Sequence, residues 1–180
     1  GSLLGEKVSV VSTGIGCPST AIAAEELIEV GADTLIRVGS AGSMQPYVHT
    51  GDVVIVSAAI RDEGTTSHYL PMEFPAIANL DVVNALRAGA AALGFLHHTG
   101  VCQSKDSFYG EVERSRMPMA QHLEDRWNAW IAAGALCSEM ESAALFIISS
   151  IQRKRAGGIM QVINEFDLAE APAQAENKHM

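Results

Sequence analysis

A glycine-rich turn between a β-branched run and a helical pattern limits the possible folds of this chain more than any other feature. Residues 7–13 are short, apolar and β-branched, which is typical of a buried strand. A turn of small residues follows, and its last residue, Ser19, can cap a helix that runs to about Val30. A second strand is predicted at residues 34–38. A strand, a helix and a strand in this order predict a parallel βαβ unit and hence an α/β fold.

The rest of the chain continues the alternation of strands and helices. The remaining expected elements are strands at residues 52–60, 98–105 and 156–163, a helix at 81–94 that Asp81 caps, and an apolar, buried helix at 141–151. Because the length suits one hydrophobic core, residues 1–180 are expected to form a single domain. The acidic, alanine-rich tail after Phe166 is expected to be a helix or loop with few contacts. Elements that would cover the edge strands are not evident, so we expect a chain truncated at both ends.

The charge balance and the cysteine count narrow the choice of partners and compartment. The chain has 12 basic and 21 acidic residues, a formal net charge of -9. Nucleic acids and anionic membranes favour a basic face, so we expect neither as a partner. An odd number of cysteines, three, favours a reducing compartment and therefore a cytoplasmic protein. We expect neither a signal peptide nor a membrane span, since no apolar run approaches ~18 residues.

Arg37 and Ser40 are candidates for binding an anion. The strand that contains Arg37 is expected to be buried, and a buried arginine needs a partner. Either Arg37 forms a structural ion pair, or it clamps an oxyanion together with the Ser40 hydroxyl. The backbone amides of residues 12–16 could also meet an anion, although a tight turn needs small residues for its own sake.

Glu139 and Glu141 stand at the beginning of the apolar helix. A carboxylate at a helix N-terminus interacts favourably with the helix dipole, so capping alone could explain Glu139. Glu141 precedes an apolar run that predicts burial, and a buried carboxylate needs hydrogen-bond donors. The two hydroxyls of a ribose could be those donors.

Aromatic and histidine residues are less informative. Phe108 and Tyr109 precede a charged loop at residues 111–116, and they could form either core packing or a surface on which a base stacks. The six histidines show no metal-ligand spacing, so we expect no metal centre. Cys17 is expected to fill space in the core.

Together these segments resemble the nucleoside phosphorylase family, most closely its uridine phosphorylase branch. Residues 12–22, followed by Glu26 and Leu27, resemble the family signature at every fixed position. The resemblance spans residues 4–164 and continues through residues 37–42, 51–53, 61–68, 73–76, 106–109 and 139–143.

The resemblance implies an α/β fold with a central mixed sheet flanked by helices. It also implies phosphorolysis of uridine to uracil and ribose 1-phosphate in nucleoside salvage, with phosphate as co-substrate and no organic cofactor. The catalytic residues would be Arg37 and Glu141. By position, phosphate would be held by Arg37 and Ser40, ribose by Ser40, Met140 and Glu141, and the base by Gly42, Phe108 and Arg114.

The resemblance further implies a homo-oligomer, either a dimer or a hexamer built as a trimer of dimers. Its active sites would be shared between subunits. Ile15 and Ser19 match positions that, in some members, contribute oxygen ligands to a cation at the dimer interface.

Three departures from the family pattern bear on substrate choice. Val112 stands where the pyrimidine branch has a glutamine that selects uracil, so the base preference is open, and Arg116 could serve in place of Arg114. The phosphate-binding segment that normally lies upstream does not occur in the sequence. Residues 163–166 do not follow the pattern expected after the last strand.

Two alternatives to a uridine phosphorylase follow from these departures. A purine nucleoside phosphorylase or nucleosidase of the same family would use an aspartate after the last strand, where this chain has Asn164 and Glu165. That difference counts against both. The other alternative is a non-catalytic relative that binds nucleosides.

Overall fold

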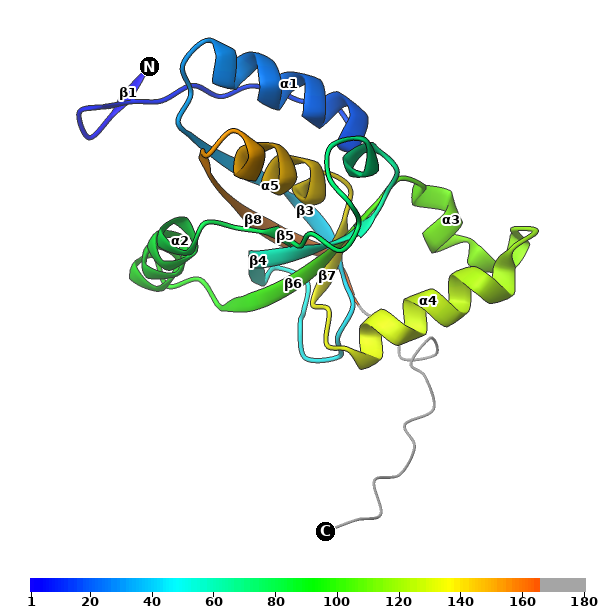
Figure 1. Cartoon of the computed structure of the whole chain (residues 1–180). Coiled ribbons are helices and arrows are strands. Elements are labelled where there is room, and N and C mark those ends of the chain that lie inside the picture. The colour runs from blue at the N-terminus through cyan, green and yellow to red at the C-terminus, as the bar shows by residue number, and fades with distance from the viewer. Residues whose placement is uncertain (166–180) are drawn as a thin grey trace.

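A mixed β-sheet forms the centre of the structure, a computed structural model that describes residues 1–165 (Figure 1). The six strands lie in the order β5-β4-β6-β7-β3-β8. Because β8 also pairs with β4, the strands other than β5 close into a ring. Their bounds are β3 (Thr34–Ser43), β4 (Val53–Asp62), β5 (Ala76–Ile77), β6 (His97–Lys105), β7 (Cys137–Glu139) and β8 (Arg155–Asn164).

The strands of the ring run in two directions. β4, β6 and β7 are mutually parallel, and β3 is parallel to β8. The two groups meet in antiparallel pairs, β3 with β7 and β4 with β8. The carboxyl ends of β6 and β7 therefore lie together, and the loops that follow them share one end of the ring. A central mixed sheet flanked by helices, as the resemblance implies, is confirmed.

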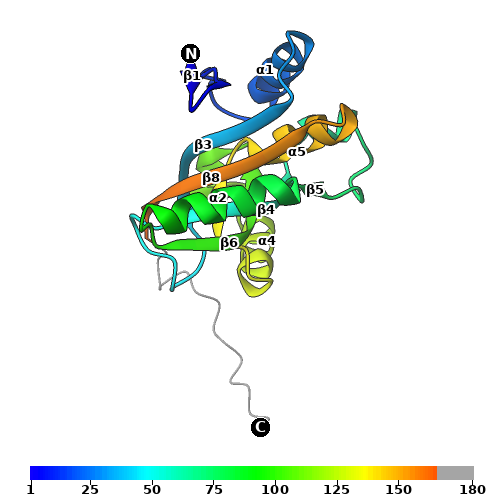
Figure 2. The same ribbon diagram turned by 90° about the vertical axis from the view of Figure 1, so that its left-hand side faces the viewer.

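The helices cover different parts of this sheet. α5 (Ser142–Ile151) lies between the sheet and α1 (Cys17–Glu29), whereas α4 (Ala120–Ala132) lies on the other side with α3 (Phe108–Val112) (Figure 1). α2 (Leu80–Ala92) packs along β4 and β8 (Figure 2). Two 3-10 turns, η1 (Thr65–His68) and η2 (Arg114–Arg116), shape the loops after β4 and α3.

The main hydrophobic core surrounds α5. Eight consecutive residues of this helix, from Ser142 to Ser149, are buried. A helix that is apolar on all sides has to be enclosed, and α5 is enclosed by α1, β4 and β8. The burial predicted for this apolar helix is confirmed. Its N-terminus is consequently fixed inside the molecule, next to the ends of β6 and β7.

The prediction of a strand at residues 7–13 is wrong. Only β2 (Glu6–Lys7) is a strand there, and it forms a short hairpin with β1 (Ser2–Leu3). Residues 8–13 run without strand hydrogen bonds, and Val10 is 95% exposed. A β-branched run favours extended backbone, but a strand also needs a partner edge. Because this run does not pair with β3, the predicted parallel βαβ unit is not formed.

The caps and the loop after β6 also differ from expectation. α1 begins at Cys17 behind Gly16, and the Ser19 hydroxyl donates to the carbonyls of Ile15 and Gly16 instead of capping the helix. The side chain of Asn79, not of Asp81, caps α2 by accepting from two backbone amides.

The charged segment 111–116 forms the end of α3 and the turn η2, where a loop was expected. The strands expected at 52–60, 98–105 and 156–163 correspond to β4, β6 and β8. The expectation for the tail after Phe166 lies outside the described residues. In the part of the chain that the structure describes, no helix is long and apolar enough to cross a bilayer.

Candidate active site

Arg37 lies between two carboxylates at the carboxyl end of β7. Its Nε donates to Glu139 Oε2 at 2.7 Å, and its Nη2 lies 2.5 Å from Glu141 Oε2. The side chain of Arg37 is 17% exposed, and those of the two glutamates are 0% and 7% exposed. One guanidinium therefore serves two buried carboxylates. The cluster carries one formal negative charge in excess, which it can keep only with further hydrogen-bond donors.

Glu139 receives those donors from the protein itself. Its carboxylate accepts the backbone amides of Glu141, at 2.9 Å, and Ser142, at 3.0 Å. The Ser104 hydroxyl donates to it from the neighbouring strand β6. Glu139 thus binds the N-terminus of α5, because Ser142 is the first residue of that helix and Glu141 is its N-cap residue. The expected interaction of Glu139 with the helix N-terminus agrees with this geometry.

Glu141 has fewer partners from the protein. Its Oε1 accepts the backbone amide of Gly16 at 2.6 Å, and its Oε2 meets Arg37. Gly14 and Gly16 both have positive φ angles, 73° and 93°, so the turn needs glycine to direct this amide toward the carboxylate. The glycine turn of the sequence therefore contacts the site through one backbone donor.

Gly39 leaves the space that the Arg37 side chain occupies. A Cβ at position 39 would lie 2.6 Å from Arg37 Nη1 and 2.9 Å from its Cζ. Residues two apart in a strand face the same side, so the guanidinium folds over the backbone of Gly39. The arginine conformation therefore requires glycine at position 39. This requirement could not be recognised from the sequence.

A cavity of about 810 Å³ adjoins this cluster. It lies between β3, α1 and residues 5–13, and Arg37 and Glu141 form part of its wall together with Thr13 and Thr20. Ligand pockets commonly measure about 300–1,000 Å³. The space between residues 8–13 and β3 is thus large enough for a small molecule. Its wall contains both a positively charged residue, Arg37, and a negatively charged one, Glu141.

The other predicted phosphate, ribose and base residues do not line this cavity. Ser40 is exposed on β3, Gly42 pairs with Ser138 of β7, and Met140 is half-buried between the two glutamates in sequence. These residues belong to the same strands or turn as Arg37 and Glu141, but none of the three lines the cavity.

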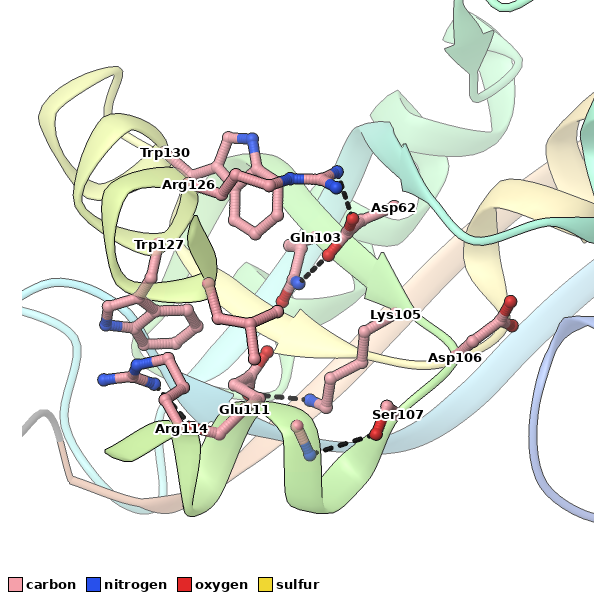
Figure 3. Close-up of a pocket in the computed structure, with 12 residues that line it drawn as sticks. Asp62, Gln103, Lys105, Asp106, Ser107, Glu111, Arg114, Arg126, Trp127 and Trp130 are labelled. Atoms are coloured by element: carbon pink, nitrogen blue, oxygen red, sulfur yellow. Dashed lines mark hydrogen bonds and ion pairs between the residues drawn. The ribbon is translucent and has the colours of Figure 1, made fainter. Parts of the chain in front are cut away.

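A second cavity, of about 160 Å³, lies between α4 and β6; Arg114 lines it (Figure 3), and Phe108 does not. Phe108 is 49% exposed, stands edge-on to Tyr109, and has Lys105 Nζ 5.9 Å from its ring centroid. Arg114 lines this cavity, donates to Glu124 Oε2 at 2.8 Å and lies over the Trp127 ring. The structure therefore does not bring Arg114 to the cavity that Glu141 lines.

The two cavities lie on opposite faces of the β6–β7 pair. Ser104 and Glu139 are paired in register and hydrogen-bonded on the face of Arg37. Their neighbours Gln103, Lys105 and Ser138 form a separate hydrogen-bonded group on the other face. Successive strand residues point to opposite sides, which accounts for the division.

The three cysteines are buried thiols of low reactivity. Cys17, Cys102 and Cys137 are free thiols, and burial raises the pKa of each above its usual range. Within residues 1–165, no group of three histidine, cysteine or acidic residues could hold a metal ion. At the positions expected to contact a cation, the carbonyl of Ile15 accepts the Ser19 hydroxyl at 2.9 Å.

Several polar residues of these two faces could not be identified from the sequence. Ser104 anchors Glu139, while Gln103 and Lys105 line the second cavity. They lie in a strand to which no functional residues were assigned. Gln103 and Lys105 alternate with Cys102 and Ser104, and this alternation could have indicated that the two polar side chains share one face of the strand. α4, which supplies the two tryptophans of the second cavity, was not predicted at all.

Comparisons with known proteins agree with the observed fold. The sequence profile of the phosphorylase superfamily matches residues 1–179, and the chain belongs to this superfamily. It is 51% identical to a uridine phosphorylase of Treponema pallidum, over 91% of this chain and 63% of that protein. It is 39% identical to the uridine phosphorylase of Escherichia coli, over 96% of this chain and 72% of that protein.

A guanosine phosphorylase of Halorubrum lacusprofundi is also similar, with 36% identity over 88% of this chain and 61% of that protein. The chain thus spans less than two thirds of the length of the Treponema and Halorubrum relatives.

Proposed function

We propose that this chain takes part in the phosphorolysis of uridine to uracil and ribose 1-phosphate, a pentosyl transfer in cytoplasmic nucleoside salvage. The observation that carries the proposal is the Arg37–Glu141 pair, which lines a ligand-sized cavity in a member of the phosphorylase superfamily. The names of two relatives support uridine as the nucleoside.

Glu141 is the proposed ribose ligand. Its carboxylate has one backbone donor and one shared guanidinium, so it can exchange the guanidinium for the 2′ and 3′ hydroxyls of a ribose. A carboxylate at this place also stabilises the positive charge that develops on the sugar as the glycosidic bond breaks. Met140, next to it in the chain, is proposed to contact the sugar as well.

Arg37 is the proposed phosphate ligand, with the Ser40 hydroxyl as a second donor. Glu139 holds Arg37 Nε in place, while the remaining N–H groups can turn from Glu141 to the phosphate. The phosphate anion then lies beside the ribose and captures the oxocarbenium-like sugar. Catalysis of this kind depends on orientation and electrostatics and needs no covalent intermediate.

Gly42, Phe108 and Arg114 are the proposed base contacts. The departing uracil carries negative charge on its carbonyl oxygens, and an arginine donor there stabilises it. Arg114 is oriented toward α4 in the structure, so this role requires residues 108–116 to turn toward the β7 end.

Further parts of the proposal concern cofactors and assembly. Phosphate is the co-substrate, and a cation bound near Ile15 and Ser19 at a dimer interface is a subsidiary proposal. A homo-oligomer, a dimer or a hexamer, would let a neighbouring subunit complete each site.

Uracil release from uridine, measured with and without phosphate, tests the proposal. We expect release that depends on phosphate and is accompanied by ribose 1-phosphate. Equal release without phosphate would instead identify a nucleosidase, and preference for guanosine would identify a purine phosphorylase. A protein that binds nucleosides and cleaves none of them would be the non-catalytic relative.

A further inference from the structure

Ser104 of β6 is a buried serine that is linked to Arg37 through one carboxylate. The residue is 0% exposed and lies in register with Glu139 of β7. Its hydroxyl donates to Glu139 Oε1, while the other carboxylate oxygen, Oε2, accepts Arg37 Nε at 2.7 Å. Ser104 does not line the cavity beside Arg37, so it lies behind the candidate site and not in it.

The hydroxyl of Ser104 has a fixed direction. Its oxygen accepts the backbone amide of Ala143, the second residue of α5, at 2.9 Å. The first amides of a helix have no acceptor within the helix, and here a serine from a neighbouring strand supplies one. A hydroxyl has a single hydrogen, and that of Ser104 is directed to Glu139. Because the residue has no exposed surface, water cannot replace either partner.

This hydroxyl distinguishes the two oxygens of Glu139 from each other. The backbone amide of Ser142 is shared, at 3.1 Å from Oε1 and 3.0 Å from Oε2, so it favours neither orientation of the carboxylate. The thiol of Cys102 lies 3.6 Å from Oε1, and a thiol is a weak donor. Ser104 is therefore the strong donor that holds Oε1, and it leaves Oε2 directed at Arg37.

The orientation of Glu139 matters for Arg37 because a guanidinium binds oxyanions through N–H groups in a rigid fork. The terminal torsion of a glutamate is broad, so a carboxylate without a donor on Oε1 is free to rotate. Oε2 then no longer fixes Arg37 Nε, and the guanidinium can turn toward Glu141, whose Oε2 lies 2.5 Å from Nη2. An arginine paired more closely with Glu141 presents fewer N–H groups to phosphate.

We propose that Ser104 is a positioning residue for phosphate: its hydroxyl orients Glu139, and Glu139 orients Arg37. The inference rests on the proposed function in one respect, because it takes Arg37 as the phosphate ligand. Ser104 touches no substrate, so its contribution lies in the affinity for phosphate and not in the chemical step.

Nuclear magnetic resonance of the Arg37 Nε–H group tests this role without any assay of activity. The signal is assigned by its loss in Arg37→Lys, and its exchange with water reports how firmly Glu139 holds it. In Ser104→Ala we expect this exchange to accelerate about tenfold, in line with the loss of one hydrogen bond to a charged group. Titration with inorganic phosphate, followed through the same signal, should give a Kd about tenfold higher in Ser104→Ala than in the wild type.

Further variants separate positioning from stability, and circular dichroism verifies that each is folded. Ser104→Thr keeps the hydroxyl and should restore both the slow exchange and the phosphate affinity. Ser149→Ala removes another buried serine, on α5, whose hydroxyl has no partner among residues 1–165, and should change neither quantity. Val83→Ala, in the core between α2 and β4, should lower the free energy of unfolding while changing neither. If Ser104→Ala does not fold, Ser104→Cys, whose thiol is a weaker donor, replaces it in the comparison.

In uridine phosphorolysis, the KM for phosphate should rise in step with the Kd, with kcat at saturating phosphate unchanged. An unchanged phosphate Kd in folded Ser104→Ala, an equal loss of affinity in Val83→Ala, or a wild-type Arg37 signal that does not respond to phosphate would overturn the inference. A wild type that binds phosphate at Arg37 but releases no uracil from uridine would count against the proposed function alone.

Discussion

The two carboxylates that share Arg37 differ in their other hydrogen-bond partners. Glu139 accepts two amides of α5 and the Ser104 hydroxyl, all of which belong to the protein's own framework. Among residues 1–165, Glu141 accepts only the Gly16 amide besides Arg37, and it faces the large cavity. The difference predicts a structural task for the first glutamate and a ligand-binding task for the second.

Glu141→Gln is expected to reduce kcat/KM for uridine while the fold stays stable. The amide keeps the shape and one acceptor but loses the charge that holds two ribose hydroxyls, a loss of about 2–4 kcal/mol of transition-state binding. That corresponds to roughly 30- to 1,000-fold in rate. Steady-state kinetics and urea unfolding measure the two effects.

The matched control is Glu139→Gln, which should lower the free energy of unfolding by about 1–3 kcal/mol because it weakens the α5 cap. Near-normal turnover in Glu141→Gln would mean that Glu141 is only a partner of Arg37.

Gly39→Ala is expected to impair activity without unfolding the chain. The three atoms nearest to the added Cβ all belong to the guanidinium of Arg37, the far end of a flexible side chain, which can move away at little cost. A displaced guanidinium no longer meets Glu141 or phosphate in the same geometry, so the KM for phosphate should rise. Gly89→Ala on α2, where the new Cβ meets no atom within 4 Å outside the helix's own backbone, is the control for the added methyl group. An unchanged KM for phosphate in Gly39→Ala would argue against Arg37 as the phosphate ligand.

At the scale of elements, Arg61 holds the loop that follows β4. All five of its N–H groups donate, to the Thr66 hydroxyl and to the carbonyls of Thr66, Leu70, Pro71 and Phe74. Arg61 is 8% exposed, so the loop wraps a buried guanidinium. The Arg61 side chain thus supplies hydrogen bonds to loop carbonyls that have no partner strand.

Arg61→Met is expected to lower the free energy of unfolding by more than about 2 kcal/mol, since several buried carbonyls lose their donors. Hydrogen exchange should accelerate first in residues 63–74. Arg87→Met, at an exposed position of α2, should change neither quantity. Equal protection of the loop in both variants would contradict the role of Arg61.

Asp52, directly before β4, links β4 to β6 through a carboxylate. It accepts the His49 amide at 2.9 Å and lies 2.9 Å from His98 Nε2. Burial alone would raise the pKa of Asp52, but the hydrogen bonds from His49 and His98 outweigh it, so the pKa lies below its ordinary value. A carboxyl with a lowered folded-state pKa stabilises the fold above its unfolded pKa, about 3.9, and loses this contribution as pH falls through the folded value.

Asp52→Asn should therefore destabilise the protein at pH 6 and have a diminishing effect below about pH 4. Urea unfolding of both proteins across this range measures the difference, with Asp125→Asn as an exposed control. A destabilisation that does not change with pH would show that the Asp52 charge is unimportant.

Elements whose own residues show a clear pattern of apolar side chains could be predicted from the sequence. Elements that form only when a distant segment pairs with them could not. β4, β8 and α5 carry apolar patterns, and these three elements and β6 were predicted close to their observed bounds. Residues 7–13 carry the same pattern, but strand formation depends on the edge of β3, which the sequence does not place. β7, only three residues long, is defined by its neighbours on both sides.

The residues of the candidate site could be predicted from the sequence, but their arrangement in space could not. Arg37 and Glu141 could be identified because buried charges are conspicuous in apolar segments, and the resemblance assigned them roles. Their contact with each other joins β3 to the end of β7 across 104 positions of the chain, and only the closed ring of strands brings them together. Sequence could likewise not show that Arg114 and Glu141 face different cavities.

At the scale of the whole molecule, exposed apolar side chains gather around the large cavity. Val11, Ile36 and Val38 line it and are 50%, 47% and 78% exposed, and Val10 on the adjoining segment is 95% exposed. In the described part of the chain, no strand pairs with β3 along most of this edge. Exposed apolar patches and unpaired strand edges are typical of surfaces that become covered on association.

We expect the protein to be at least a dimer at micromolar concentration, with activity that falls on dilution to the monomer. Val38→Asp should shift the mass from light scattering toward the monomer, because a charge on this face is costly to bury. Val112→Asp, at a half-exposed valine on α3, is the matched control and should leave the mass unchanged. A shared site requires activity and mass to decline together in the dilution series and in Val38→Asp. A monomer with full activity would rule out an active site shared between subunits. It would not contradict the proposed roles of Arg37 and Glu141.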